Sequence, residues 1–292
     1  MNRLSFLASL LAVFLPGVSL CAEYTKKDEF KLRTGDLVAT VRPASAFTLG
    51  GIAWRGLPLA AANGHYGFVI AYTPGQFIGS GHTEGGKEAV ESVELVEGGG
   101  TPVDLPPGLG RELEGGAWKL VKKSSLGEAV EIECTTLLEK DRLRCVHLMQ
   151  VKSDCTLHLA YPFMFIWPAT TTDYAAGLTN GQVVVGQFEN QGWKVRSNAR
   201  WMAVYSAGSG IGAVTLFPAD FPAGDEGGHR HTFWDLPSYH KQYFQFAHGR
   251  RFQAGEEYRF EVELFPFEAS PENWKASVAA LLKEHEVDVE IP

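Results

Sequence analysis

Histidines are concentrated between residues 229 and 248, where four of the nine in the chain occur. Imidazole titrates near neutral pH and therefore suits proton transfer. Side chains two residues apart on a strand point to the same face of the sheet. We therefore expect His229 and His231 to converge on one point. The alternative, that these histidines are solvated or sit in the core with a hydrogen-bond partner, stays open.

The strand that we expect to follow carries Tyr239, His240 and Lys241 in succession. Tyr239 and Lys241 are predicted to share one face, with His240 on the other. A tyrosine hydroxyl serves as proton donor when a cation lowers its pKa, and an indole such as that of Trp234 stacks on the apolar face of a sugar. The predicted catalytic residues of this region are His229, His231 and Tyr239, and its predicted substrate contacts are Arg230, Trp234, His240 and Lys241.

A second candidate is the glycine-rich segment of residues 80–88. Glycines on both sides of its central residues let the backbone approach a ligand closely. If the segment is extended, His82 and Glu84 share a face, which places a base beside an acid. The segment lacks the spacing of a phosphate-binding P-loop. We predict His82 and Glu84 as catalytic residues, with an ordinary exposed loop as the alternative.

His229, His231 and Asp235 also allow a metal site as an alternative, since two histidines and a carboxylate can hold a divalent ion. The spacing is similar to the first cupin motif. A cupin offers a further histidine after a Pro-x-Gly element, and none follows here. We therefore predict no metal site and no cofactor.

The elements that must position these residues are mainly β-strands, because apolar and polar residues alternate along most of the chain. The clearest predicted strands are residues 37–42, 90–95, 118–122, 130–138, 143–151, 156–161, 182–188, 201–205, 213–217 and 258–265. One helix is predicted near the C-terminus, with Ser270 as N-cap and Pro271 in its first turn. We predict an all-β fold, a large antiparallel β-sandwich with one C-terminal helix. Trp54, Trp167 and Trp193 lie on strand-like runs and are expected in its core, with the rim of a cleft as the alternative for Trp167, which ends a strand beside Pro168.

The first 22 residues read as a secretory signal peptide, with Arg3 before a short apolar run and small residues at a cleavage region. We expect residues 23–292 to form a single β-sandwich domain in the periplasm or outside the cell. Lipid anchoring at Cys21 is less favoured, because Leu20 precedes it where a small residue is preferred. No later segment is apolar for long enough to span a bilayer. The formal net charge of −8 argues against a nucleic-acid partner.

Three cysteines follow the signal peptide. Cys134 and Cys145 lie on two predicted strands joined by a tight loop. If that loop centres on residues 139–140, the two cysteines stand opposite each other at disulfide distance. An exported protein then favours a Cys134–Cys145 disulfide, whereas a shift of the loop by one residue removes the pairing.

The organisation of the chain resembles the galactose mutarotase-like supersandwich, a fold also found in polysaccharide lyases and glycosidases. The resemblance rests on the strand and loop at residues 50–56, the central hairpin at residues 131–150, and the turn and final strand at residues 252–267. The Asn-x-x-Asn-His signature of the mutarotase itself is absent. The resemblance implies a broad sheet face that binds sugars, with His and Glu or Tyr as acid and base.

Three functions remain open for a carbohydrate substrate. The first is proton transfer by His and Tyr, including β-elimination of a uronate polymer, with Arg230 or Lys241 neutralising the enolate. The second is a glycosidase with paired carboxylates from among Glu84, Glu88 and Asp235. The third is a non-catalytic sugar-binding module. All three depend on the late histidines and the His82–Glu84 pair lining one hollow.

Overall fold

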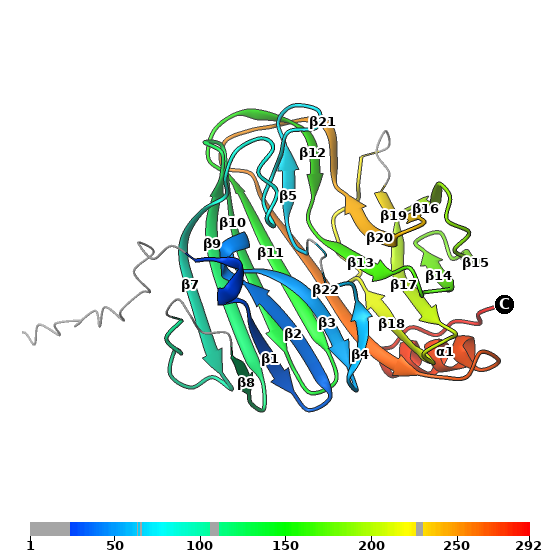
Figure 1. The fold of residues 1–292 in the computed structure, drawn as a ribbon. Coiled ribbons are helices and arrows are strands. Elements are labelled where there is room, and N and C mark those ends of the chain that lie inside the picture. Colours follow the sequence, from blue (N-terminus) through cyan, green and yellow to red (C-terminus); the bar gives the residue numbers. More distant parts are fainter. Residues whose placement is uncertain (1–23, 63, 65, 106–110, 226–229) are drawn as a thin grey trace, which may run out of the picture.

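The computed structural model describes residues 24–62, 64, 66–105, 111–225 and 230–292. The predicted signal peptide of residues 1–22 and the predicted catalytic residue His229 lie outside the described residues. Within them, strands dominate and one α-helix lies near the C-terminus (Figure 1).

A nine-stranded antiparallel sheet is the largest element of the fold. Along β10 (Val130–Leu138) the residues alternate between buried and half-buried, as in a sheet with one face on the core and the other toward solvent. The strands pair in the order β15 (Val183–Gln187), β14 (Asp173–Leu178), β17 (Ala199–Ser206), β18 (Ile211–Leu216), β22 (Glu257–Glu268), β11 (Leu143–Val151), β10 (Val130–Leu138), β9 (Trp118–Leu126) and β7 (Ala89–Glu97).

Three smaller sheets pack against the inner face of the large one. The first has the order β4 (Leu57–Ala60), β3 (Thr48–Trp54), β2 (Leu37–Arg42), β1 (Phe30–Thr34) and β8 (Glu112–Glu114), and β1 and β8 are parallel. The second has the order β21 (Ala247–Phe252), β12 (Cys155–Tyr161), β5 (Val69–Ala71) and β6 (Phe77–Ile78). The third has the order β13 (Met164–Pro168), β20 (Tyr239–Gln245), β19 (Arg230–Leu236) and β16 (Trp193–Ser197).

Aromatic rings join the two layers. Phe260 on β22 packs edge-on against Phe68 at 6.0 Å between ring centroids and against Phe246 at 4.9 Å. On β9, Trp118 Nε1 donates a hydrogen bond to the carbonyl of Arg33 on β1 at 3.1 Å. The core is therefore one continuous apolar cluster between the sheets, as expected for a sandwich.

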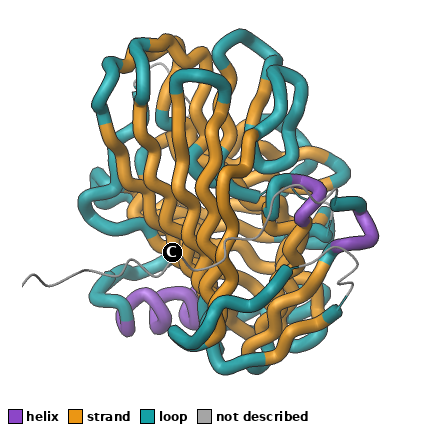
Figure 2. The backbone as a smooth tube through the Cα atoms, turned by 90° about the vertical axis from the view of Figure 1, so that its left-hand side faces the viewer, coloured by secondary structure: helices purple, strands orange, loops and turns teal. Residues whose placement is uncertain are grey.

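The helix α1 (Trp274–Glu284) packs on the outer face of the nine-stranded sheet. Trp274 stacks on Tyr205 at 5.6 Å. The helix begins after the predicted Ser270 and Pro271, because the Ser270 carbonyl accepts the N–H groups of Asn273 and Trp274 in a preceding turn. The short helices η1 (Lys26–Asp28) and η2 (Pro43–Ser45) lie on the opposite side of the strands from α1 (Figure 2). No helix among the described residues is both long and apolar enough to cross a membrane.

The hairpin of β10 and β11 has its predicted bounds, but the predicted disulfide is absent. The loop closes where Glu139 N–H donates to the Arg142 carbonyl, one residue later than a disulfide requires. Cys134 therefore stands opposite His147, and Cys145 stands opposite Thr136. Both cysteines are free and buried.

The all-β sandwich with a C-terminal helix, predicted from the sequence, is confirmed. The region of clustered histidines is also a hairpin, as predicted, with β19 and β20 joined at residues 237–238.

Candidate functional site

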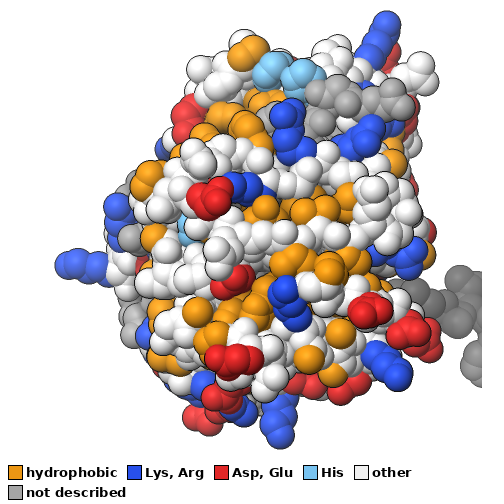
Figure 3. Space-filling view, turned by 90° about the vertical axis from the view of Figure 1, so that its right-hand side faces the viewer, with side chains coloured by type: hydrophobic (Ala, Val, Ile, Leu, Met, Phe, Trp, Pro, Cys, Tyr) orange, Lys and Arg blue, Asp and Glu red, His pale blue; other side chains and the backbone are white. Residues whose placement is uncertain are grey.

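A hollow of about 230 Å³ lies over the two four-stranded sheets, and most of its lining is aromatic. We call it the aromatic hollow. Its lining residues are Val69, Phe77, His82, Tyr161, Met164, Trp193, Trp234, Lys241 and Tyr243. Figure 3 shows the side of the molecule on which β15, β16 and α1 lie, where hydrophobic side chains reach the surface between charged ones.

The aromatic residues of the hollow form a continuous wall. Trp193 and Trp234 are register partners on β16 and β19, and their rings stack at 5.1 Å with an interplanar angle of 18°. Trp193 meets Tyr243 edge-on at 5.9 Å, and Tyr243 meets Tyr161 at 4.9 Å. Phe77 then stacks on Tyr161 at 6.4 Å. Such a wall presents ring faces to the apolar C–H surface of a ligand.

His82 and Glu84 form the polar end of this wall. The His82 ring lies 5.6 Å from that of Phe77, and its Nδ1 lies 3.3 Å from Glu84 Oε2. The His82 side chain is 17% exposed and that of Glu84 is 51% exposed. The backbone N–H of Glu84 holds the pKa of the Glu84 carboxyl below its usual range; burial acts in the opposite direction, and the His82 ring adds to the lowering. The predicted acid–base pair is thus formed, at the rim of the hollow.

A turn that requires glycine positions the His82 side chain at the hollow. The N–H of His82 donates to the carbonyl of Gly79 at 3.0 Å, and Gly79 has a φ of 104°. A side chain at Gly79 would lie 2.4 Å from the carbonyl oxygen of Phe68, so that only glycine fits there. Below the turn, Glu88 accepts the N–H of Ser80 at 3.0 Å.

Lys241 supplies a cation to the hollow. Its ammonium has no hydrogen bond or ion pair among the described residues. Burial lowers the pKa of Lys241, and the charge of Glu84 partly offsets this effect. Burial raises the pKa of Tyr161 to about 12 and also raises that of Tyr243. Both phenols are therefore protonated at neutral pH and can donate.

His231, predicted as catalytic, lies in the core instead. It is 2% exposed, and its ring packs against Phe217 at 4.3 Å and Phe244 at 4.4 Å. Its Nδ1 accepts the N–H of Ala199 at 3.1 Å, and burial lowers the pKa of His231 to about 3. His231 is therefore a neutral structural histidine that does not line the hollow.

His240, predicted as a substrate contact, is also buried. Its Nδ1 lies 2.8 Å from Asp235 Oδ1, and its ring stacks on Phe188 at 4.0 Å. Burial lowers the pKa of His240, with Asp235 acting in the opposite direction. The second oxygen of Asp235 accepts the N–H groups of Glu189 and Gln191. This buried pair anchors the loop that leads into Trp193.

The remaining predicted residues divide between the hollow and its surroundings. Lys241 and Trp234 line the hollow, whereas Tyr239 is half-buried against the main core. Arg230 is half-buried at the start of β19 and does not line the hollow.

The carboxylates proposed for a glycosidase have separate partners. Glu84 faces His82, Glu88 pairs with Lys122 at 2.5 Å, and Asp235 pairs with His240. In the described part of the chain, no group of three or more His, Cys, Asp or Glu side chains is arranged to hold a metal ion.

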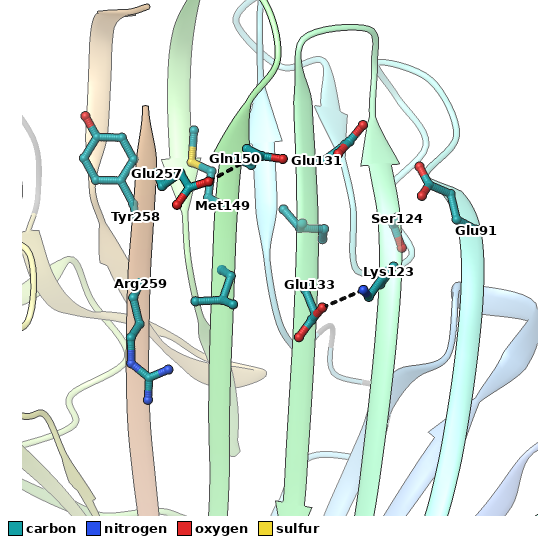
Figure 4. Close-up of a pocket in the computed structure, with 12 residues that line it drawn as sticks. Glu91, Lys123, Ser124, Glu131, Glu133, Met149, Gln150, Glu257, Tyr258 and Arg259 are labelled. Carbon is teal, nitrogen blue, oxygen red and sulfur yellow. Dashed lines mark hydrogen bonds and ion pairs between the residues drawn. The ribbon is translucent and has the colours of Figure 1, made fainter. Parts of the chain in front are cut away.

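A larger cavity, of about 360 Å³, lies on the exposed face of β7, β9, β10, β11 and β22. Figure 4 shows Glu133 directed at Lys123 and Gln150 directed at Glu257. Two pairs of its polar side chains satisfy each other, whereas Glu131 and Arg259 pair with residues outside the cavity. Tyr258 is the only aromatic side chain among the described residues that line it, so the cavity offers no stacked aromatic pair. We therefore place the candidate site at the aromatic hollow.

The sequence reasoning missed most of the aromatic wall. Trp193 was expected in the core but is 37% exposed. Phe77, Tyr161 and Tyr243 were not singled out. The alternation along β20 could have found Tyr243, which lies two residues beyond Lys241 on the same face.

Comparison with solved structures shows that the chain has the galactose mutarotase-like fold. A Klebsiella pneumoniae protein provisionally assigned as an aldose 1-epimerase aligns with a TM-score of 0.52 at 10% identity, over 87% of this chain and 82% of its own. The α-galactosidase of Lactobacillus brevis aligns with a TM-score of 0.53 at 10% identity, over 88% of this chain and 42% of the enzyme. The galactosidase domain of the α-galactosidase–sucrose kinase AgaSK aligns with a TM-score of 0.52 at 11% identity, over 85% of this chain and 42% of its own.

This chain therefore spans less than half the length of the two galactosidase chains. At these identities the likeness concerns the fold alone. No protein-family profile matches the sequence, and no curated protein matches it.

Proposed function

We propose that this protein is a carbohydrate-active enzyme that holds a sugar ring in the aromatic hollow and acts on it by proton transfer. The observation that carries the proposal is the stacked Trp193–Trp234 pair in one hollow with His82 and Lys241. Indole faces bury the C–H surface of a sugar, while imidazole exchanges protons near neutral pH. The names of the structural relatives, an aldose 1-epimerase and galactosidases, agree with a sugar substrate.

The residues of the hollow suggest roles for the reaction. His82 is the proposed base, and Glu84 orients its ring and stabilises the imidazolium that forms. The hydroxyl groups of Tyr161 and Tyr243 are the proposed acids. Burial raises the pKa of both and keeps them protonated, and the charge of Arg196 acts on the pKa of Tyr243 in the opposite direction. Lys241 stabilises negative charge that develops on the substrate.

β-Elimination of a uronate is the reaction that uses all of these roles. The base takes the proton beside the carboxylate, and the resulting enolate is stabilised by Lys241. The bond between the neighbouring carbon and the glycosidic oxygen then breaks, and a tyrosine protonates the leaving oxygen. This assignment replaces the buried His231 with His82 as the base.

Sugar binding is the first test. Binding of mono- and oligosaccharides is measured by calorimetry for the wild type and for Trp193→Ala, with Trp54→Ala as control. Trp54 lies outside the hollow and is covered by the guanidinium of Arg55 at 4.5 Å. We expect Trp193→Ala to weaken binding about tenfold or more, and Trp54→Ala to leave it unchanged. Absence of binding by the folded wild type to any sugar in a broad panel contradicts the proposal.

Catalysis is tested separately on the sugars that bind. Exchange of anomers is followed by NMR, and elimination is followed by ultraviolet absorbance of the unsaturated product. Turnover that disappears in His82→Gln supports the proposed base. Binding without turnover on every bound sugar identifies the protein as a sugar-binding module instead.

We further propose that the chain is exported and acts in the periplasm or outside the cell. The basic, apolar and small-residue segments at the start of the sequence support this location. Expression of the full chain in a bacterium, followed by mass spectrometry of the periplasmic fraction, tests it. Recovery of the uncleaved chain from the cytoplasm alone contradicts export.

A further inference from the structure

Lys241 differs in its partners from Lys122, a buried lysine on β9. Lys122 is paired with Glu88 at 2.5 Å and donates to the Ala46 carbonyl at 2.9 Å. Lys241 has no such partner among the described residues, although it is half-buried between aromatic side chains. Removing an ammonium from water without a counter-ion costs free energy. A ligand with a negative charge would offset this desolvation free energy by pairing with the Lys241 ammonium.

Arg196 lies three residues after the lining residue Trp193 on β16, which places a second cation on a strand that borders the hollow. Its charge acts on the hydroxyl of Tyr243, one of the lining residues, and opposes the burial that raises the pKa of this tyrosine. Arg196 is exposed, and its guanidinium has no hydrogen bond or ion pair among the described residues. Lys241 therefore lines the aromatic hollow, and Arg196 lies beside it on the strand that carries Trp193.

The backbone of β16 is distorted where it carries Arg196. Val195 and Arg196 have φ values of 73° and 62°, and the register with β19 shifts between Val195 and Ser197. The left-handed region is unfavourable for a β-branched residue such as valine. Backbone strain of this kind concentrates at ligand sites, where it aims a side chain that a regular strand would direct elsewhere.

The other charged and titratable groups around the hollow come from two further elements. His82 and Glu84 belong to the turn after β6, and the half-exposed Glu84 already pairs with His82. Arg196 belongs to β16. The whole protein carries a formal net charge of −8, so its overall field repels anions and only a local cluster of cations can attract one.

We infer that the aromatic hollow selects a sugar bearing a fixed negative charge, a carboxylate or a sulfate, which Lys241 and Arg196 bind while the ring stacks on Trp193 and Trp234. This inference rests on the proposed function. It widens the uronate named there to any sugar with a fixed negative charge, and it assigns recognition of that charge to two residues. An ammonium meets the anion as a point charge, and a guanidinium meets two of its oxygens at once. The pairing neutralises both partners inside an apolar wall, where charge-assisted hydrogen bonds are strong.

The test compares matched sugars that differ only in the group at C6, which is a carboxylate in one member and a neutral hydroxymethyl group in the other. Calorimetry measures the binding of the methyl glycosides of glucuronate and glucose, and of galacturonate and galactose, to the mature protein. Glucose 6-sulfate separates a requirement for a carboxylate from a requirement for any anion. We expect the charged member of at least one pair to bind about tenfold or more tightly, with the difference shrinking as salt is added.

Variants assign that preference to the two cations. Lys241→Met is expected to bring the charged sugar down to the affinity of its neutral partner, and Lys241→Arg to keep the preference. Arg196→Gln is expected to reduce it, and Lys119→Met, at an exposed lysine on β9, to leave it unchanged. The wild-type comparison does not depend on any variant folding.

The outcomes separate the inference from the proposed function. Equal binding of charged and neutral sugars, or tighter binding of the neutral ones, overturns the inference and the uronate reaction, and leaves sugar binding with proton transfer at the hollow standing. Absence of binding for all of these sugars and a broad neutral panel, with the protein folded, overturns both. A preference that survives in the doubly substituted Lys241→Met/Arg196→Gln protein also overturns the inference.

Discussion

Asp235 Oδ1 lies 2.8 Å from His240 Nδ1, and both side chains are almost completely buried. The other carboxylate oxygen of Asp235 accepts the N–H groups of Glu189 and Gln191 at 2.7 and 3.2 Å. The N–H of Asp235 donates to the carbonyl of Gly192 at 2.9 Å. A buried carboxylate with these partners fixes the loop before Trp193, and so connects the core of the protein to the aromatic hollow.

Replacement of Asp235 is therefore expected to affect both stability and binding. Asp235→Ala leaves His240 and two loop N–H groups without their acceptor, which costs about 3 kcal/mol of unfolding free energy. Urea denaturation measures this loss. Asp36→Ala is the control, since Asp36 forms an exposed pair with Arg55 and its loss costs about 1 kcal/mol or less. Sugar binding by the folded Asp235→Ala protein should also weaken, and an unchanged affinity contradicts the role of Asp235 in positioning Trp193.

The two histidines predicted as catalytic should behave differently. His82→Gln removes the proton-transfer group at the rim of the hollow, and we expect the rate on a bound sugar to fall about a hundredfold or more with binding retained. His231→Gln changes a core side chain, so that stability falls and the rate per folded molecule stays within about twofold. Initial rates on samples of known folded fraction provide the comparison. A larger rate loss in His231→Gln than in His82→Gln reverses the assignment.

Buried histidines should make the protein sensitive to acid. Burial lowers the pKa of His147 to about 4 and that of His231 to about 3. The unfolded chain binds protons at these residues near pH 6.5, whereas the folded chain does not. As the pH falls below 6.5, the unfolding free energy should decrease, by about 1.4 kcal/mol per pH unit for each histidine near pH 5.

Denaturation of His147→Gln at several pH values checks this prediction. In this variant the unfolding free energy should change less steeply with pH than in the wild type, by the contribution of one histidine. His248→Gln, at an exposed histidine on β21, should keep the full slope. Equal slopes in both variants and in the wild type contradict the assignment.

The sequence predicted the framework well because strand periodicity is a local property. The hairpin of residues 130–151 alternates throughout, and both of its strands have their predicted bounds. The prediction of a Cys134–Cys145 disulfide was wrong because it depended on the position of one turn. The alternation of apolar and polar residues does not determine that position.

The site was predicted in part for a similar reason. Alternation placed His240 opposite Lys241, but it could not decide which face is buried, and here His240 faces the core. His82 and Lys241 were identified from their residue types. Their position in one hollow with Trp193 depends on contacts between strands far apart in the sequence, which periodicity does not predict. The bulge in β16 that accompanies the exposed Trp193 has no signal that sequence periodicity would detect.

The loop that carries His82 depends on a buried ion pair. Glu88, whose side chain is 3% exposed, lies 2.5 Å from Lys122 Nζ on β9 and also accepts the N–H of Ser80. Removing one partner of a buried pair leaves the other charge without compensation, and this costs more than the pair itself contributes. The loop is therefore anchored by a contact whose loss destabilises the protein and releases His82.

Glu88→Gln is expected to lower the unfolding free energy by about 3–5 kcal/mol. The double variant Glu88→Gln/Lys122→Met removes the stranded charge and should regain much of this loss. The control is Glu133→Gln, because Glu133 pairs with Lys123, the neighbour of Lys122, on the exposed face of the same strand, where the loss is about 1 kcal/mol or less. Urea denaturation measures all three variants. Similar losses for Glu88→Gln and Glu133→Gln, or a double variant less stable than Glu88→Gln, contradict the proposed anchoring.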